Sequence, residues 1–104
     1  MADMQDRRDA FESKYAHDAQ MQFKAEARRN RLLGLWAAEI LGKSGDDATD
    51  YAKEVVKADF EEAGDEDVYR KVKGDLGERV EERTLRDKMA ELMVQAKAQL
   101  IDET

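Results

Sequence analysis

The sequence predicts an all-α protein, a four-helix bundle with a long first helix. Two features of composition favour this class: the 104-residue chain contains no Pro, and charged residues make up 41% of it. Apolar residues, another 41%, recur at intervals of three and four positions, the spacing that places side chains on one face of a helix. Glycines divide these periodic stretches into four. A chain of this length is expected to form one domain.

The first helix is expected to begin near Asp3, whose side chain can cap it, and to run to Leu41. Gly42 and Gly45 then end it. Such a helix is roughly 55 Å long at 1.5 Å per residue, so its first half is expected to overhang the bundle. Only its second half has a wide apolar face, in which Trp36 is interpreted as a core residue. The apolar residues of this half are Leu32, Leu33, Leu35, Trp36, Ile40 and Leu41.

The second helix is expected to start after Ser44, which forms a capping-box pattern with Asp47. It continues to about Glu62, and Gly64 stops it. Its apolar residues follow the spacing of one buried helical face. They are Ala48, Tyr51, Ala52, Val55, Val56 and Phe60.

A short third helix can be capped by Asp65 and is expected to be interrupted near Gly74 and Gly77. Its apolar residues are Val68, Tyr69, Val72 and Leu76. A charged connector, residues 78–83, separates it from the last helix.

Thr84 and Asp87 form a second capping-box pattern, which predicts the start of the fourth helix. This helix presents a row of apolar residues at helical spacing, as a bundle requires. They are Leu85, Met89, Leu92, Met93, Ala96 and Leu100.

The net charge of −7 is unevenly distributed along the chain. Residues 1–31 carry seven Lys/Arg and six Asp/Glu, whereas residues 32–104 carry eleven and nineteen. The larger, acidic part would repel nucleic acid. The basic cluster at residues 24–31 lacks an aromatic platform and is interpreted as solvated helix surface. We therefore expect no nucleic-acid partner.

The chain has no Cys, which suits a reducing cytoplasm. No apolar run is long enough for a signal peptide or a membrane span, because Gly34 and Glu39 break the longest one, Leu32–Leu41. We expect a soluble, cytoplasmic protein that does not insert into a membrane.

Residue patterns of enzymes and metal sites are missing. His17 is the only His and has no nucleophile or second His at a useful spacing. The acidic run at residues 59–68 lacks the glycine of a calcium-binding loop, since Arg70 stands at that position. Its carboxylates can instead complement the dipole of the third helix. No phosphate-binding loop is present. We expect no catalytic residue, no metal and no cofactor, so the protein is predicted not to be an enzyme.

Near the N-terminus, Phe11, Tyr15, Ala19 and Phe23 recur every fourth residue and form a thin apolar stripe. An isolated helix in water is marginal without packing. The stripe therefore either folds back on the bundle or binds another protein, and the residues alone leave both possibilities open.

Long segments resemble the zeta subunit family of the alphaproteobacterial F-type ATP synthase. They are EARRNRLLGLWAAEILGKSG at residues 26–45, YAKEVVKADFEEAGDEDVYRKV at residues 51–72 and DRRDAFESKYAHDAQMQFKAEARRN at residues 6–30. The likeness is strongest over residues 6–72. The last helix agrees in type, and residues 74–83 match nothing characteristic of the family.

The resemblance implies a regulatory subunit that inhibits ATP hydrolysis by the catalytic head of the F-type ATP synthase. It implies a four-helix bundle, residues 21–104, and a mobile inhibitory segment, residues 1–20, similar in role to the basic helix of the mitochondrial ATPase inhibitor protein. The protein would be a monomer when free and would reach the cytoplasmic face of the inner membrane through the synthase. The implied partner-binding residues are Arg7, Arg8, Phe11, Lys14 and Tyr15.

Two other functions stay open at this stage. One is a helical interaction scaffold that binds a different partner. The other is a small regulator that senses a nucleotide, for which the sequence contains no motif.

Overall fold

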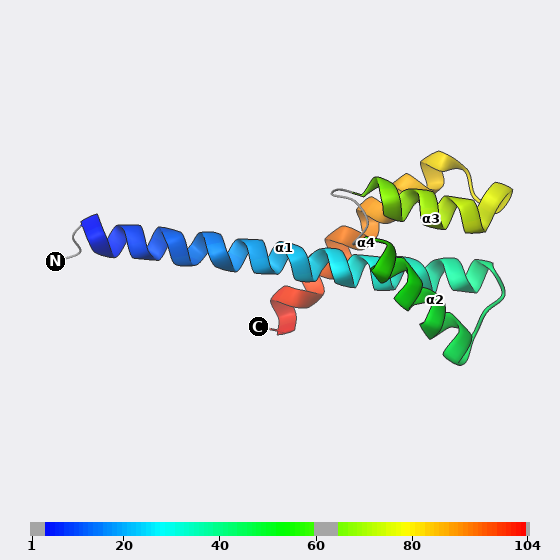
Figure 1. The fold of residues 1–104 in the computed structure, drawn as a ribbon, viewed down its shortest axis with the longest axis horizontal. Helices are drawn as coiled ribbons and strands as arrows, with labels where there is room; N and C mark the ends of the chain where they lie inside the picture. The colour runs from blue at the N-terminus through cyan, green and yellow to red at the C-terminus, as the bar shows by residue number, and fades with distance from the viewer. Residues whose placement is uncertain (1–3, 60–64, 104) are drawn as a thin grey trace.

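The computed structural model of the chain describes the backbone of residues 4–59 and 65–103 and the side chains of residues 19–59 and 65–103. Within this part the regular structure consists of four α-helices and one 3-10 helix, with no strand, which confirms the all-α prediction. The elements are α1 (Met4–Ile40), α2 (Gly45–Ala58), α3 (Glu66–Leu76), the 3-10 helix η1 (Gly77–Arg79) and α4 (Glu82–Glu103) (Figure 1).

The long helix α1 is the central element of the fold. Helices α2, α3 and α4 surround its C-terminal half, while its N-terminal half extends beyond them, so the predicted overhang is confirmed (Figure 1). The resulting shape is elongated, with extents of 61 × 25 × 21 Å. The expected mobility of residues 1–20 stays a prediction.

The hydrophobic core lies between the C-terminal half of α1 and the other three helices. Small residues on α1 let α2 approach closely: a Cβ atom added to Gly34 would lie 2.5 Å from the Cα atom of Ala52. The largest buried apolar side chains come from all four helices. They are Leu33, Tyr51, Val55, Val68, Val72, Leu76, Leu85, Met89, Leu92 and Leu100.

The prediction that Trp36 is a core residue is wrong. The buried face of α1 contains the small residues Gly34, Ala37 and Ala38, and α2 packs closely against it at Gly34. The bulky Trp36 is displaced to the flank, where it is half-buried against the edge of the core. Its ring lies 5.7 Å from the Lys88 ammonium group. Ile40, expected on the same apolar face, is 36% exposed at the end of α1.

Helix α2 begins as predicted but without the expected capping box. Ser44 occupies the N-cap position with extended backbone angles, φ −147° and ψ 165°, yet its side chain makes no capping hydrogen bond. Asp46 and Asp47 lie in the first turn, where their negative charges interact favourably with the helix dipole. Tyr51, Ala52 and Val55 are buried as predicted, whereas Ala48 and Val56 are half-buried.

The sequence predicted that the second helix continues to about Glu62, whereas α2 ends at Ala58 in the described residues. Phe60, Glu62 and Gly64 lie outside the described residues.

Helix α3 is continuous through Gly74, so the interruption predicted there is wrong. It ends at Gly77, which has φ 57° and so adopts a conformation that disfavours other residues. The buried residues of α3 include Val68, Val72 and Leu76, as predicted, and Tyr69 packs partly buried against the core.

The capping box predicted at Thr84 and Asp87 is also wrong. With Thr84 as N-cap the helix would begin at Leu85, but α4 begins three residues earlier, at Glu82. The amide of Leu85 accordingly donates to the Glu81 carbonyl oxygen, with an N–O distance of 3.1 Å. Thr84 therefore lies inside the first turn. The predicted apolar face is correct for Leu85, Met89, Leu92, Ala96 and Leu100, and Met93 is half-buried.

Candidate partner-binding surface

The five residues implied as partner-binding all belong to the part of α1 that extends beyond the bundle (Figure 1). They are Arg7, Arg8, Phe11, Lys14 and Tyr15. Their side chains lie outside the described residues, so their contacts remain predictions. The backbone around them is helical and continuous with the bundle, because α1 runs without a break from Met4 to Ile40. The spacing of the apolar stripe therefore holds along this segment.

The described end of the stripe faces solvent. Ala19 is exposed, and Phe23 is 61% exposed, although a Phe side chain is usually buried. Sequence reasoning placed Phe23 in the stripe but did not count it among the partner-binding residues. Its exposure favours the interpretation that this end of the stripe does not fold back on the bundle.

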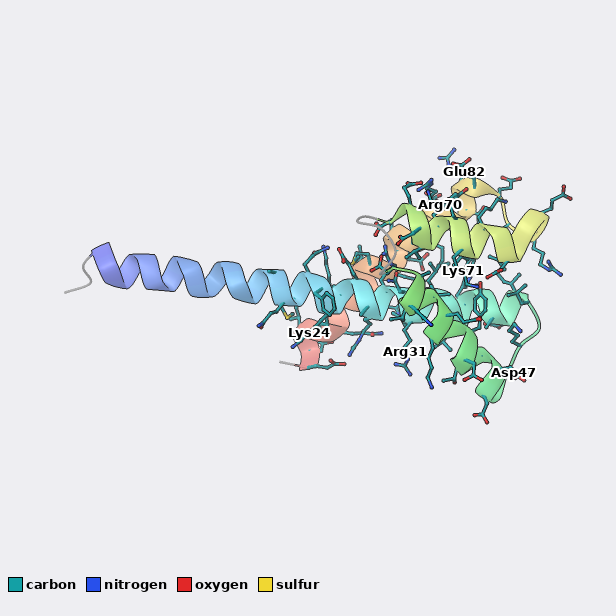
Figure 2. All side chains as sticks on the ribbon, in the orientation of Figure 1. Lys24, Arg31, Asp47, Arg70, Lys71 and Glu82 are labelled. Carbon is teal, nitrogen blue, oxygen red and sulfur yellow. The ribbon has the colours of Figure 1, made fainter. Side chains whose placement is uncertain are left out.

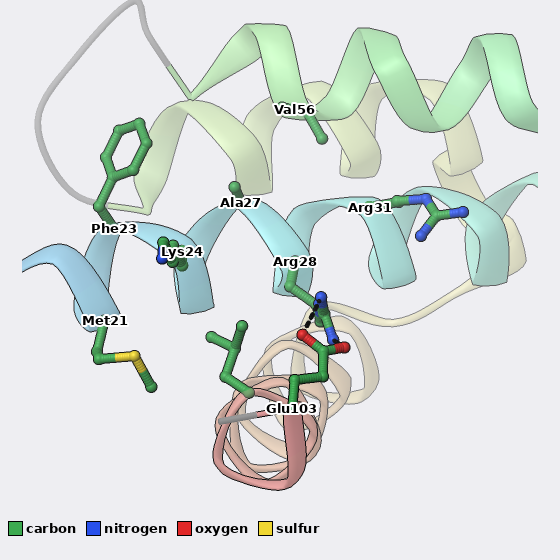
Figure 3. Close-up of a pocket in the computed structure, with 9 residues that line it drawn as sticks. Met21, Phe23, Lys24, Ala27, Arg28, Arg31, Val56 and Glu103 are labelled. Atoms are coloured by element: carbon green, nitrogen blue, oxygen red, sulfur yellow. Dashed lines mark hydrogen bonds and ion pairs between the residues drawn. The ribbon is translucent and has the colours of Figure 1, made fainter.

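A groove of about 640 Å³ lies where α1 leaves the bundle. Met21 and Phe23 leave α1 on opposite sides, and Val56 of α2 and the end of α4 complete the lining (Figure 3). Cationic side chains of α1 lie along the same groove. They are Lys24, Arg28 and Arg31.

Arg28 joins this part of α1 to the end of α4. Its guanidinium group forms a bidentate ion pair with Glu103, in which Arg28 Nη2 lies 2.9 Å from Glu103 Oε2 (Figure 3). The hydrogen bonds raise the pKa of Arg28 and lower the pKa of Glu103. The charge of Arg28 is thus balanced within the molecule.

A second groove, of about 320 Å³, lies between α1 and α2. Three cations line it, namely Arg31, Lys53 and Lys57, beside the apolar side chains of Leu35 and Val56. Acidic and basic side chains cover the outside of the bundle (Figure 2). Within the described part of the chain, however, Lys24, Arg31, Lys53 and Lys57 have no ion-pair partner. No described carboxylate therefore neutralises these four cations.

A buried polar cluster links α1 to the start of α3. Arg29 is 1% exposed, and its Nε donates to Asn30 Oδ1 at 2.7 Å while its Nη2 donates to Asp65 Oδ1 at 2.8 Å. This hydrogen bond lowers the pKa of Asp65. Asp65 takes the N-cap position of α3 as predicted, but its side chain serves the ion pair and makes no capping hydrogen bond.

The interpretation of the basic cluster at residues 24–31 as solvated surface is wrong for Arg29 and Asn30, which are buried. One signal could have found them. Arg29 and Asn30 lie four residues before Leu33 and Gly34, so all four share the buried face of α1. The acidic run that begins α3 supplies the opposite charge.

Other polar contacts hold the helices together. Tyr51 donates from its hydroxyl group to Asp75 Oδ2 at 2.8 Å, and burial and this bond raise the pKa of Tyr51. The guanidinium group of Arg86 stacks 3.8 Å from the ring centre of Tyr69 and pairs with Glu66 at 2.9 Å. These contacts join α2 to α3 and α3 to α4, so they serve the bundle.

The described residues form neither a metal site nor a membrane-spanning helix. No three His, Cys, Asp or Glu side chains among them gather closely enough to hold a metal ion. None of the helices in the described part is long and apolar enough to cross a membrane. His17 lies among the residues whose side chains are not described.

Comparison with known proteins identifies the family. The family model of the ATPase inhibitor subunit zeta matches residues 1–99, nearly the whole chain. The chain belongs to the ATPase inhibitor subunit zeta family. No curated protein matches the sequence. A solved structure, determined by solution NMR, is 68% identical over 81% of this chain and 99% of its own, with a TM-score of 0.75.

Membership of the zeta family confirms the resemblance that the sequence suggested. The family match includes the overhanging half of α1 as well as the bundle. It makes the protein an ATPase inhibitor subunit, a regulatory class.

Proposed function

We propose that the protein inhibits ATP hydrolysis by the F-type ATP synthase by inserting the N-terminal segment of α1 at a catalytic subunit interface. The observation that carries the proposal is the projection of α1 beyond the bundle in a member of an inhibitor family (Figure 1). A projecting helix can enter a cleft in another protein, whereas a helix packed along its whole length cannot. Residues 1–20 are the proposed inhibitory segment, and residues 21–104 present it.

The mechanism requires binding and no chemistry from this chain. Phe11 and Tyr15 act as aromatic anchors, while Arg7, Arg8 and Lys14 pair with acidic groups of the catalytic head. A helix held at a catalytic interface blocks the rearrangement that each turnover requires. The free protein is proposed to be a monomer that binds the head on the cytoplasmic side of the membrane.

A titration of the purified catalytic head with the full-length protein tests the proposal. ATP hydrolysis is expected to fall with a saturable dependence on protein concentration. The double variant Phe11→Ala/Tyr15→Ala is expected to inhibit at least 10-fold less well, because removing a central aromatic anchor often costs about 2 kcal/mol or more. Undiminished hydrolysis at saturating concentrations of the wild-type protein would rule the function out.

The groove between α1 and α2 favours a second candidate, a regulator that binds a nucleotide. Arg31, Lys53 and Lys57 lie along it without ion-pair partners among the described residues, beside apolar side chains that could contact a base. Titration calorimetry with ATP and ADP tests this candidate. Binding that Lys53→Glu/Lys57→Glu abolishes supports it, and a heat of dilution alone excludes it.

A further inference from the structure

Phe23 is an exposed aromatic side chain at the junction of α1 and the bundle. It is 61% exposed, and it continues the stripe of Tyr15 and Ala19 at the same four-residue interval. Exposed aromatic side chains that border a groove are typical of protein-binding surfaces. Phe23 therefore has the character of a contact residue rather than of a bundle residue.

The charges beside Phe23 favour an acidic partner. Lys24 follows it directly, and Arg31 lies two turns further along the same groove. Neither has an ion-pair partner within the described part of the chain, although Asp and Glu outnumber Lys and Arg by 25 to 18 in the sequence. Arg28, between them, is already paired with Glu103. The groove thus combines an exposed aromatic ring, apolar walls and two cations that no described carboxylate neutralises.

The continuity of α1 determines where this groove goes when the helix binds. Tyr15 and Phe23 are eight residues apart on one unbroken helix, which is about 12 Å at 1.5 Å per residue. No break lies between the proposed inhibitory segment and the bundle. Insertion of the segment therefore carries the groove to the rim of the cleft that receives it.

We propose that this groove is a second docking surface for the catalytic head, with Phe23 and Lys24 as its main contacts. Its occupant is a segment of the head at the rim of the catalytic interface, one that carries an apolar side chain next to carboxylates. The apolar side chain packs on Phe23 and the groove wall, and the carboxylates pair with Lys24 and Arg31. The proposal rests on the proposed function and adds that the bundle itself contributes to affinity.

The test compares full-length single variants in the inhibition titration. Phe23→Ala and Lys24→Glu are expected to raise the half-inhibitory concentration at least 10-fold. The matched controls lie on α4: Val94→Ala removes an apolar side chain that is 71% exposed, and Lys97→Glu reverses an exposed cation. Both controls are expected to stay within twofold of the wild type. Thermal unfolding of each variant shows that the bundle is intact.

Salt provides a second measurement that a merely structural role of Lys24 would not affect. Added salt screens attraction between charges, so it is expected to weaken inhibition by the wild type. Lys24→Glu is expected to show a smaller salt dependence. Equal inhibition by the wild type, Phe23→Ala and Lys24→Glu would overturn the proposal while leaving the proposed function intact.

Two further outcomes identify a different explanation. If the wild type does not inhibit the head, the proposed function fails and the docking surface fails with it. If sedimentation shows a wild-type dimer that Phe23→Ala converts to a monomer, the groove binds a second copy of the chain, which also overturns the proposal. A wild-type monomer that binds the head more tightly than Phe23→Ala supports it.

Discussion

The buried guanidinium group of Arg29 contacts the carboxylate of Asp65, 36 residues later in the chain, with an Nη2–Oδ1 distance of 2.8 Å. The two partners differ in environment, since the Arg29 side chain is 2% exposed and that of Asp65 is 50% exposed. The pair connects the middle of α1 to the first turn of α3. It also orients Arg29 Nε toward Asn30, so one cation satisfies two acceptors.

Removing either partner of this pair is expected to destabilise the bundle. Breaking a buried ion pair on one side typically costs about 3–5 kcal/mol. Because the Asp65 side chain is 50% exposed, the expected cost of Arg29→Ala is lower, at about 2–3 kcal/mol. Arg29→Lys is expected to restore little of this, because an ammonium group cannot hold both acceptors. Urea unfolding measures the effect.

Arg28→Ala is the matched control for Arg29→Ala. Arg28 is the preceding residue and also pairs with a distant carboxylate, but the pair with Glu103 lies at the surface. Its loss is expected to destabilise the bundle much less than loss of the Arg29 pair, because solvent screens a surface ion pair. Equal destabilisation by the two variants would contradict the role assigned to Arg29.

The sequence predicts the helices of this protein well and their mutual contacts less well. Glycines at positions 42 and 77 have positive φ angles, so local backbone chemistry marks the ends of α1 and α3. Arg29 and Asn30 read as surface because burial of a charge depends on a partner 36 residues away. Trp36 reads as core because hydrophobicity alone does not reveal that α2 packs on the small residues beside it.

For capping and site residues, too, the sequence predicts local features better than contacts. Ser44 and Thr84 both fit a capping-box pattern, yet neither forms a capping box, because the pattern specifies only residue types. Ser44 takes the N-cap position without a capping hydrogen bond. Thr84 lies inside a helix that starts at Glu82. The family resemblance, drawn from long strings of residues, identified the inhibitor class. Phe23 was not selected as a contact residue, since its exposure follows from where the bundle ends.

Gly34→Ala is expected to destabilise the protein by roughly 1–3 kcal/mol, the usual cost of overpacking. The added Cβ atom would lie 2.5 Å from the Cα atom of Ala52, and backbone cannot move aside as a flexible side chain can. The better helix propensity of Ala offsets only part of this cost. Chemical unfolding followed by the fluorescence of Trp36 measures the change.

Gly74→Ala is the matched control for Gly34→Ala, and it is expected to have the opposite effect on stability. Gly74 lies inside α3 with no atom within 4 Å of an added Cβ. Replacement is expected to stabilise by about 0.5–1 kcal/mol through helix propensity alone. If both glycine variants were stabilising, the close approach of α1 and α2 would be wrong.

Asp59→Asn is expected to stabilise the protein at neutral pH. Burial raises the pKa of Asp59, and repulsion from Asp67 and Glu26 adds to the shift, while the amide of Asn30 and the charge of Arg29 oppose it. A carboxyl group with a raised pKa favours the folded state at low pH, and this contribution is lost as the pH rises through the folded-state pKa. The charged Asp59 is therefore a net cost at pH 7.

The unfolding temperature of Asp59→Asn is expected to lie above that of the wild type at pH 7. No rise is expected at pH 3, where Asp59 is protonated. Asp65→Asn has the opposite sign, since its pKa is lowered by Arg29 and its contribution is lost as the pH falls through that value. Melting curves at both pH values distinguish the two carboxylates.

Residues 1–20 are expected to move more than the rest of α1. The ribbon of this half extends past the other three helices (Figure 1), and a helix without tertiary contacts is marginal in water. Backbone ¹⁵N relaxation is expected to give lower order parameters there than for residues 29–38, which include the buried face of α1. Uniform order parameters along all of α1 would exclude this mobility.

Deletion of residues 1–20 separates the proposed inhibitory segment from the bundle that presents it. The unfolding temperature is expected to change by less than about 3 °C, because residues that extend beyond a packed domain contribute little to its stability. Inhibition of the catalytic head is expected to disappear. A full-length control, Glu82→Ala/Arg83→Ala, alters exposed residues at the start of α4 and is expected to inhibit normally.

Each result of the deletion has a definite meaning for the structure. Loss of inhibition with an intact bundle supports insertion of the N-terminal helix as the inhibitory step. A truncated bundle that inhibits as well as the full chain would assign inhibition to the bundle surface and reject insertion. If the truncated chain no longer folds, Phe11 and Tyr15 contribute to the core, and the stripe folds back on the bundle instead of binding the head.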